Sequence, residues 1–234
     1  MVNVGIDLHK TQFTTCARNS GRQEFGKYST TAAGYEEFLK KVSVWQENGG
    51  QVRVAVESTG NTRYFKGRME EAGVGVTVVN TLKLKVVNES VKKTDKHDAA
   101  TIAEFLEKDM LPQSQLCSRQ SEHLRRLLKV RTTLVRTQVV VKNQIHALFC
   151  SEGQEDVKSA VLQSKRGRKR LLDALGQWQH GLVAQPLLQM IESLEENIKT
   201  TEEQLRVLSA GDRMVELLKT IPGCGEICAW TIRA

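Results

Sequence analysis

The sequence is poor in aromatic residues and contains no long apolar run. Phe, Trp and Tyr make up 5% of its 234 residues, which disfavours a protein that binds single strands by stacking bases on a wall of aromatic rings. No apolar run approaches the roughly 20 residues that span a bilayer. The first residues, MVNVGIDLHK, lack the apolar core of a signal peptide. We therefore expect a cytoplasmic protein with no membrane partner.

Cysteines are few and scattered. The chain has five, an odd number, and Cys224 and Cys228 have no further cysteine or histidine pair nearby to complete a zinc site. This pattern favours free thiols in a reducing compartment over a disulfide framework.

Positive charge is concentrated in the middle of the chain. Residues 1–112 have a net charge of +2 and residues 184–234 a net charge of −3, whereas residues 113–183 carry 13 basic and 5 acidic side chains, a net charge of +8. A segment with this excess indicates a polyanionic partner, and nucleic acid is the leading candidate.

The first hundred residues alternate strand-like and helix-like patterns. Three strands, a helix, a strand, a helix, a strand and a final helix are expected at 2–8, 11–18, 22–29, 34–47, 52–57, about 62–72, 74–80 and from Asp95 onward. This order predicts the α/β fold of an RNase H-like (RuvC-like) domain, in which a mixed sheet of three antiparallel strands is extended by parallel ones and flanked by helices.

From about residue 119 the pattern is helical only. Leu127, Leu134, Val141 and Leu148 repeat every seven residues, and a cleaner heptad runs from Leu187 to Leu208. A repeat sustained for three heptads favours a coiled coil. The same apolar stripe would serve for packing within the chain or with a second subunit, which would make a homo-oligomer.

A basic run, SKRGRKR, lies between these two helical stretches, and further basic residues precede it. A charge run is often only a solvated surface, but here the whole segment is basic, as expected of a nucleic-acid-binding surface. The residues that we expect to contact nucleic acid are Arg125, Arg126, Lys165, Arg166, Arg168, Lys169 and Arg170.

Four carboxylates occupy positions suited to metal binding. Asp7 ends the first strand and Glu57 ends the Val-rich strand, while Asp95 and Asp98 share one face at the start of a helix. In an RNase H-like sheet the two strands are neighbours and the last helix crosses their ends, so the four groups should converge. Each has an ordinary alternative, such as a helix-end acid or an ion pair, but their combination favours a catalytic site. His9 and His97 lie nearby, either as proton shuttles or as exposed neighbours, and are left out of the catalytic set.

Converging carboxylates provide the oxygen ligands that Mg²⁺ prefers. Two such ions about 4 Å apart can stabilise both the attacking and the leaving oxygen in phosphoryl transfer. We therefore expect Mg²⁺ or Mn²⁺ to be bound by Asp7, Glu57, Asp95 and Asp98.

Three segments, GIDLHK, VESTGNTRY and KTDKHDAATIAEFL, resemble the signature blocks of the insertion sequence 110 family of transposases, which is related to pilin-gene invertases. The resemblance implies a RuvC-like catalytic domain at 1–112 whose acidic tetrad corresponds to Asp7, Glu57, Asp95 and Asp98. It also implies a helical coiled-coil region at 113–212, and a guide, or bridge, RNA that pairs with donor and target DNA in a bacterial or archaeal cell. The expected function is Mg-dependent DNA cleavage and strand exchange.

Residues 217–232, LLKTIPGCGEICAWTI, resemble a helix-hairpin-helix, whose turn offers backbone N–H groups to a phosphate. An ordinary turn between helices fits the same letters. In the family this motif opens a domain with a catalytic serine, and residues 213–234 would be only its start. We expect this chain to lack the rest, to be inactive alone in strand exchange, and not to use Ser58 or Ser90 as a substitute.

Other functions remain open. A stand-alone RuvC-like nuclease such as a junction resolvase would cleave without a partner domain, and a coiled-coil DNA-binding scaffold would carry an inert acidic cluster. A sugar-kinase-like or actin-like ATPase shares the Gly-Ile-Asp start, but the chain is too short and lacks a second Gly-rich phosphate loop. Metal binding would distinguish the scaffold from the enzymes.

Overall fold

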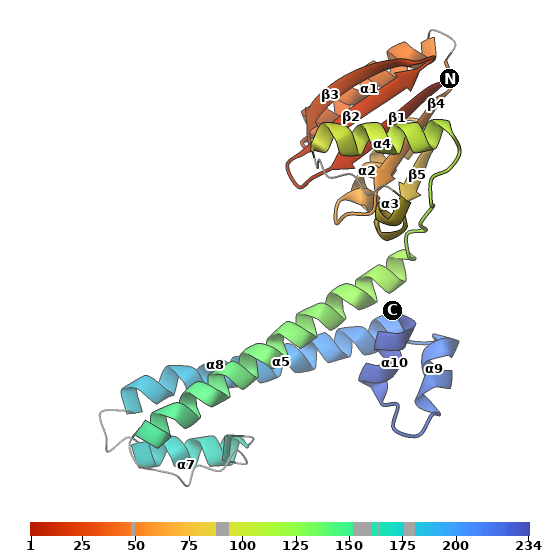
Figure 1. The fold of residues 1–234 in the computed structure, drawn as a ribbon. Coiled ribbons are helices and arrows are strands. Elements are labelled where there is room, and N and C mark those ends of the chain that lie inside the picture. The colour runs from red at the N-terminus through yellow and green to blue at the C-terminus, as the bar shows by residue number, and fades with distance from the viewer. Residues whose placement is uncertain (48–49, 88–93, 152–160, 163, 176–180) are drawn as a thin grey trace. The chain divides into compact units, whose positions relative to one another are not determined.

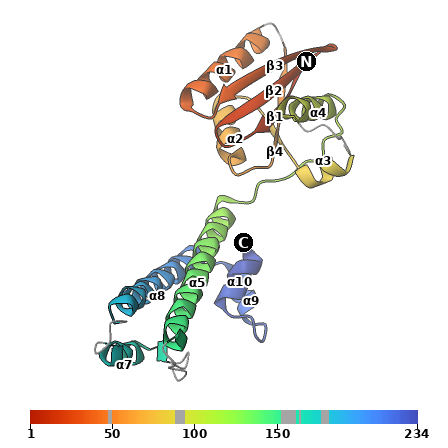
Figure 2. The ribbon, with the colours of Figure 1, turned by 60° about the vertical axis from the view of Figure 1, so that its left-hand side comes forward.

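The chain divides into two compact units, Met1–Leu116 and Cys117–Ala234. The computed structural model describes residues 1–47, 50–87, 94–151, 161–162, 164–175 and 181–234. Figures 1 and 2 show the elements of both units from two directions.

The first unit contains five strands and four helices in the described residues. In chain order they are β1 (Val2–Leu8), β2 (Gln12–Asn19), β3 (Arg22–Ser29), α1 (Ala32–Glu47), β4 (Val52–Glu57), α2 (Thr62–Glu71), β5 (Val76–Val79), α3 (Thr81–Val87) and α4 (Asp95–Glu107). All eight elements expected from the sequence are present, and α3 is an additional short helix.

The strands form one mixed sheet with the order β3-β2-β1-β4-β5. β1 pairs antiparallel with β2 and parallel with β4, while β2 pairs antiparallel with β3, and β4 parallel with β5. The predicted α/β fold with an RNase H-like mixed sheet is therefore confirmed.

Helices cover both faces of this sheet, so that every residue of the central strand β1 is buried. Val4 and Ile6 point into the core formed with α1 and α2, whereas Gly5 points to the opposite face, against α4. Figure 2 shows α4 on one side of the sheet and α1 on the other. Alternation along β1 therefore directs Asp7, two residues after Gly5, toward the α4 face.

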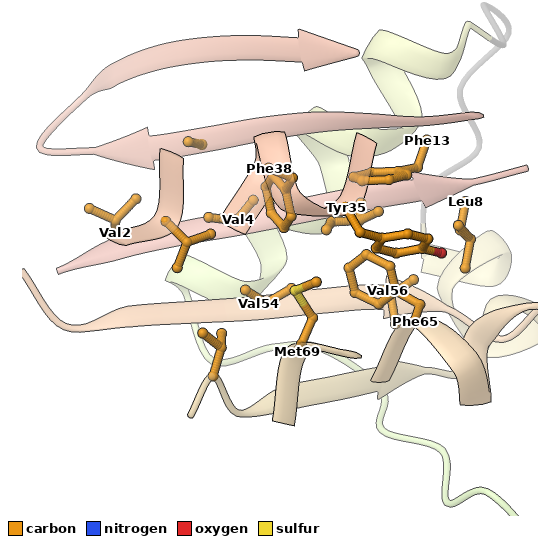
Figure 3. Close-up of a cluster of buried hydrophobic side chains, with 14 of the residues drawn as sticks. Val2, Val4, Leu8, Phe13, Tyr35, Phe38, Val54, Val56, Phe65 and Met69 are labelled. Atoms are coloured by element: carbon orange, nitrogen blue, oxygen red, sulfur yellow. The ribbon is translucent and has the colours of Figure 1, made fainter. Parts of the chain in front are cut away.

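The core on the α1 and α2 face is rich in rings, although aromatics are scarce in the chain. Phe13 lies with its ring centroid 5.3 to 5.6 Å from those of Tyr35, Phe38 and Phe65, and Figure 3 shows these side chains packed against Val4 and Val56. These aromatic residues are thus buried in the interior of this unit, where such large side chains contribute much of the hydrophobic stabilisation.

The second unit is helical. Its described residues form α5 (Arg119–Ser151), α7 (Lys165–Leu175), α8 (Gly181–Ser209), α9 (Arg213–Lys219) and α10 (Glu226–Arg233). The sequence pattern places the basic run between two helices, but the structure makes it the helix α7. Lys, Arg and Leu are good helix formers, and the buried Leu171 gives this helix an apolar contact with the core.

The heptad stripe of α8 packs against α5 of the same chain. Ile191 and Leu194 share a core with Val141 and Ile145 of α5. Farther along α8, Leu205 joins a second core formed with Leu124 and the last two helices, among other residues. The partner helix is thus supplied in cis, and the described stripe is covered without a second subunit.

The end of the unit folds back on these long helices. α9 and α10 are joined by the turn that contains Gly223 (φ 82°), and the buried Trp230 donates its indole N–H to Ser209 Oγ at 2.8 Å. The two short helices expected from residues 217–232 are therefore present. Across the described residues, no helix has a stretch long and apolar enough to cross a membrane.

Candidate functional site

Two of the four predicted carboxylates belong to neighbouring parallel strands, β1 and β4, and lie at the carboxyl-end edge of the sheet. In the parallel pair of β1 and β4, Ile6 lies opposite Val56, and Asp7 and Glu57 each follow one residue later. Ile6 and Val56 point into the core with α1 and α2, so alternation directs Asp7 and Glu57 to the other face, under α4. The carboxyl ends of neighbouring parallel strands thus bring both acids to the same place.

Helix α4 brings Asp95 and Asp98 to this edge. Its N-cap Thr94 accepts a hydrogen bond from the backbone N–H of His97 at 3.2 Å, and both aspartates lie in the first turn. The helix can lie close to β1 because Gly5 has no side chain. A Cβ at that position would be 2.2 Å from the backbone oxygen of Ala99 and 2.3 Å from the nitrogen of Ala103.

His9 links Asp7 to Asp95. Its Nε2 lies 3.0 Å from Asp7 Oδ2 and 3.5 Å from Asp95 Oδ1. One ligand atom from each of the three residues lies within 4.8 Å of the others, which makes this a group that could hold a metal ion. Among the described residues, neither Glu57 nor Asp98 belongs to that tight group.

Asp7 is buried in an acidic environment. The residue is 5% exposed, and this burial is the largest influence on the carboxyl group, raising its pKa above the ordinary value. His9 acts in the opposite direction, while the negative charges of Asp95 and Asp98 raise the pKa further. A buried carboxylate among other carboxylates is costly unless a positive charge compensates for it.

These residues fit a divalent cation. Asp7 and Asp95 supply the carboxylate oxygens that Mg²⁺ and Mn²⁺ prefer, whereas imidazole suits other transition metals better. Asp7 and Asp95 are therefore the stronger ligand candidates of the tight group, and the nearby His9 is better suited to orient Asp7 through its hydrogen bond.

Two residues outside the predicted set help to shape the site. The sequence does not distinguish a catalytic role for His9 from that of an exposed neighbour, so His9 is absent from the predicted catalytic set. Asn61 donates from Nδ2 to the backbone oxygen of His9 at 3.2 Å and so connects the start of α2 to the turn after β1. His9 lies within the block GIDLHK and Asn61 within VESTGNTRY, and this position in a signature block is what the sequence offers to identify them.

The predicted nucleic-acid contacts in the second unit are exposed, with one exception. Arg125 donates to the backbone oxygen of Ala234 at 2.5 Å, and Arg126 pairs with Glu122. The exposed basic residues of α7 are Lys165, Arg166, Lys169 and Arg170.

Arg168 is the exception, with 2% of its surface exposed. Its guanidinium donates to both carboxylate oxygens of Glu195, at 2.9 and 2.7 Å, and to the backbone oxygen of Leu162 at 2.8 Å. This burial corrects the assignment of Arg168 to the nucleic-acid surface. The residue instead joins α7 to α8, because a buried cation needs a paired anion.

Only one of the two serines named in the sequence analysis lies in the described residues. Ser58 is exposed after the end of β4. Ser90 lies outside the described residues.

Comparisons with known proteins identify the family. The model of a transposase family, the DEDD type of insertion sequence 110, matches residues 4–152. A probable family 20 transposase of Pseudomonas aeruginosa is 23% identical over 243 residues, which cover 99% of this chain and 67% of the relative. The transposase for insertion sequence element IS1111A of Coxiella burnetii is 24% identical over 245 residues, covering 99% of this chain and 62% of that protein. The chain therefore belongs to the insertion sequence 110 family of transposases.

Proposed function

We propose that the first unit is the metal-dependent catalytic domain of a DNA transposase, with Asp7, Glu57, Asp95 and Asp98 as its acidic tetrad. The observation that carries the proposal is the tight group around Asp7, whose donor atoms come from β1, the turn that follows it and α4. Residues far apart in the chain are brought together there around a carboxylate that is only 5% exposed.

The chemistry is phosphoryl transfer on DNA. Divalent cations bound at such a site would stabilise charge on the attacking and leaving oxygens of a phosphodiester. The tetrad would hold the cations, and His9 would keep Asp7 oriented through the 3.0 Å contact. Asn61 keeps the backbone at His9 in place.

We further propose that DNA is the substrate, that a guide RNA is a second partner, and that the whole protein acts as a homo-oligomer. The exposed cations of α5 and α7 support nucleic-acid binding, because a cluster of Lys and Arg attracts phosphates without reading sequence. The guide RNA and the oligomer rest on the family resemblance, which implies a coiled-coil region, and not on the described heptad stripe of α8, which packs against α5 of the same chain.

Metal binding provides the decisive test. Calorimetric titration with Mn²⁺ is expected to show binding to the unaltered chain and a loss of about tenfold or more in affinity for Asp7→Asn and Asp95→Asn. A matched control is Asp109→Asn, which removes the same charge beyond the other end of α4, where Asp109 pairs with Arg53. Unaltered Mn²⁺ affinity in both site variants would refute the tetrad assignment, as would the absence of Mn²⁺ binding to the unaltered chain.

The basic surface is tested through salt dependence. The affinity of the chain for duplex DNA should fall with salt with a log–log slope of about −0.9 per phosphate contact. The double change Lys169→Gln and Arg170→Gln should flatten this slope, whereas Lys199→Gln with Lys219→Gln, exposed on α8 and α9, should not. Equal slopes for the two double variants would move the nucleic-acid surface elsewhere.

Strand exchange is expected to require more than these residues, because the family resemblance assigns part of that chemistry to a serine in a further domain. We propose that residues 1–234 alone bind metal and nucleic acid without exchanging strands. An exchange assay with donor and target DNA, guide RNA and Mg²⁺ tests this, and efficient recombination by residues 1–234 would contradict it.

A further inference from the structure

A hollow of about 820 Å³ lies beside the carboxylate site, on the side away from Glu57. Its wall is formed by β2, β3 and the start of α4, and includes Thr14, Phe25, Lys27, Asp95 and Lys96. The hollow therefore shares Asp95 with the proposed metal site. Its volume lies within the range of sites that bind small ligands or parts of larger ones.

The sheet register places this hollow on the catalytic face. Asp7 lies opposite Thr14, and Thr14 lies opposite Lys27. Directly paired residues on neighbouring strands point to the same face, so Lys27 faces the same side as Asp7, two strand spacings or about 10 Å away. A row of side chains thus leads from β3 across β2 to the carboxylate on β1.

Two lysines of the hollow have no acidic partner among the described residues. Within the part of the chain that the structure describes, neither Lys27 nor Lys96 forms an ion pair, whereas Lys41 pairs with Glu24 and Lys108 with Glu104. Lys27 and Lys96 are exposed, and both line a hollow whose acidic member, Asp95, would be neutralised by a metal ion.

Phe25 fixes the position of Lys96. The ammonium nitrogen of Lys96 lies 5.8 Å from the centroid of the Phe25 ring, within the range of a cation–π contact. Phe25 is 41% exposed, so that its ring is accessible to the Lys96 side chain at the surface. Because the ammonium group already occupies the ring, the contact suits a positioned cation better than a stacked base.

We propose that this hollow binds a backbone phosphate of the nucleic-acid strand that leads into the carboxylate site, with Lys27 and Lys96 as its cations. Phe25 is a positioning residue that acts through Lys96. The proposal rests on the proposed function, since it concerns the strand on which the tetrad acts. Lysine binds phosphate as a point charge, so the subsite does not read the base sequence.

Binding to a single strand without metal tests the subsite. Fluorescence anisotropy in EDTA with a labelled DNA of about 12 nucleotides is recorded at several salt concentrations for Lys27→Gln, for Lys96→Gln and for the double variant. Each lost phosphate contact should reduce the log–log salt slope by about 0.7 on a single strand. The matched control, Lys40→Gln with Lys66→Gln, removes two lysines from α1 and α2 on the opposite face and should leave the slope unchanged.

The outcomes separate this proposal from the proposed function. Equal slopes for the Lys27 and Lys96 double variant and for the control would overturn the subsite, whatever the Mn²⁺ titration shows. An RNA of the same sequence provides a second arm, because DNA and RNA share the phosphodiester. A weaker slope with DNA or with both nucleic acids supports a subsite for the strand that is cut, whereas a change with RNA alone overturns that assignment.

The role of Phe25 is tested by a double-mutant cycle. Phe25→Leu should weaken binding in the unaltered chain and have no further effect when Lys96→Gln is already present, because Phe25 acts only through Lys96. A loss of equal size in both backgrounds would show that Phe25 contacts the nucleic acid itself, and would overturn its role as a positioning residue.

Discussion

Gly5 faces α4 where this helix crosses β1, and its replacement by alanine tests how the acidic site is held together. An added Cβ would lie 2.2 Å from the backbone oxygen of Ala99, whereas ordinary contact begins at 3.4 Å. Either the helix or the strand must therefore yield by about 1.2 Å. Backbone atoms cannot turn aside as a flexible side chain can, so the strain is carried by the whole helix.

Overpacking of a well-packed interior costs about 1–3 kcal/mol, and occasionally more. Gly5→Ala should therefore lower the free energy of unfolding of the first unit by at least 1 kcal/mol or so. It should also weaken Mn²⁺ binding, because a shift of α4 moves Asp95 away from Asp7, which stays on β1.

Cys16 provides a direct probe of this displacement. It lies opposite Gly5 in the sheet and is fully buried beneath Ala99 and Ala103 of α4. Burial also raises the pKa of its thiol, so the native protein should alkylate slowly there and rapidly at the exposed Cys150 and Cys228.

The assay combines denaturant unfolding, Mn²⁺ titration and alkylation followed by peptide mass spectrometry. Gly5→Ala should accelerate alkylation of Cys16. Gly67→Ala is the matched control, because a Cβ on this α2 residue meets nothing within 4 Å, and alanine in place of a helical glycine should stabilise by up to about 1 kcal/mol. If Gly5→Ala matched the unaltered chain in stability, metal affinity and Cys16 alkylation, the close approach of α4 would not be what assembles the site.

Three further changes test other parts of the molecule. Asp7→Asn should raise the melting temperature in EDTA at neutral pH and abolish stabilisation by Mn²⁺. Because the pKa of Asp7 is raised in the folded state, the unaltered chain should lose stability as pH rises from about 3.8 through that pKa, and Asp7→Asn should remove this loss. Glu195→Ala should destabilise the second unit by about 2–3 kcal/mol in urea unfolding, because it leaves the Arg168 cation buried without its partner. The loss should be slightly smaller than for a fully buried pair, because Glu195 is 33% exposed; a loss below about 0.5 kcal/mol would show that the pair is solvated. Leu205→Ala should cost about 2–5 kcal/mol because Leu205 is fully buried, whereas Val207→Ala, at a residue 71% exposed, should be nearly neutral; equal effects would contradict the packing of α8 on α5.

Strand and helix positions in the first unit followed from local patterns. Period-2 alternation and Val-rich runs indicate strands, and the structure has β1 at the residues predicted and β4 ending at Glu57, as expected. The four acids proposed for the site were also predicted from local positions, because a carboxylate at a strand end or a helix start can bind a metal ion; the structure groups Asp7 and Asp95 with His9. The packing distance between α4 and β1 was not predicted. The need for glycine at position 5 becomes evident only in the fold, where the backbones of α4 and β1 approach closely.

The role of individual polar side chains depended on their neighbours in space. His9 reads as an exposed residue, and only the fold brings its ring between Asp7 and Asp95. Arg168 sits in a run of five basic residues that look equivalent, yet the rotation of α7 buries it against Glu195. A charge run fixes composition, whereas the helix phase decides which of its members faces the interior.

The partner of the heptad stripe was likewise decided by tertiary structure. The sequence by itself determined that α8 carries an apolar seam, because the spacing of four and three residues defines one helical face. It did not determine what covers that face, since any helix with a complementary stripe satisfies the same burial. In the fold the covering helix is α5 of the same chain, with Val141 and Ile145 packed against Ile191 and Leu194, because packing the two apolar stripes together removes both from water.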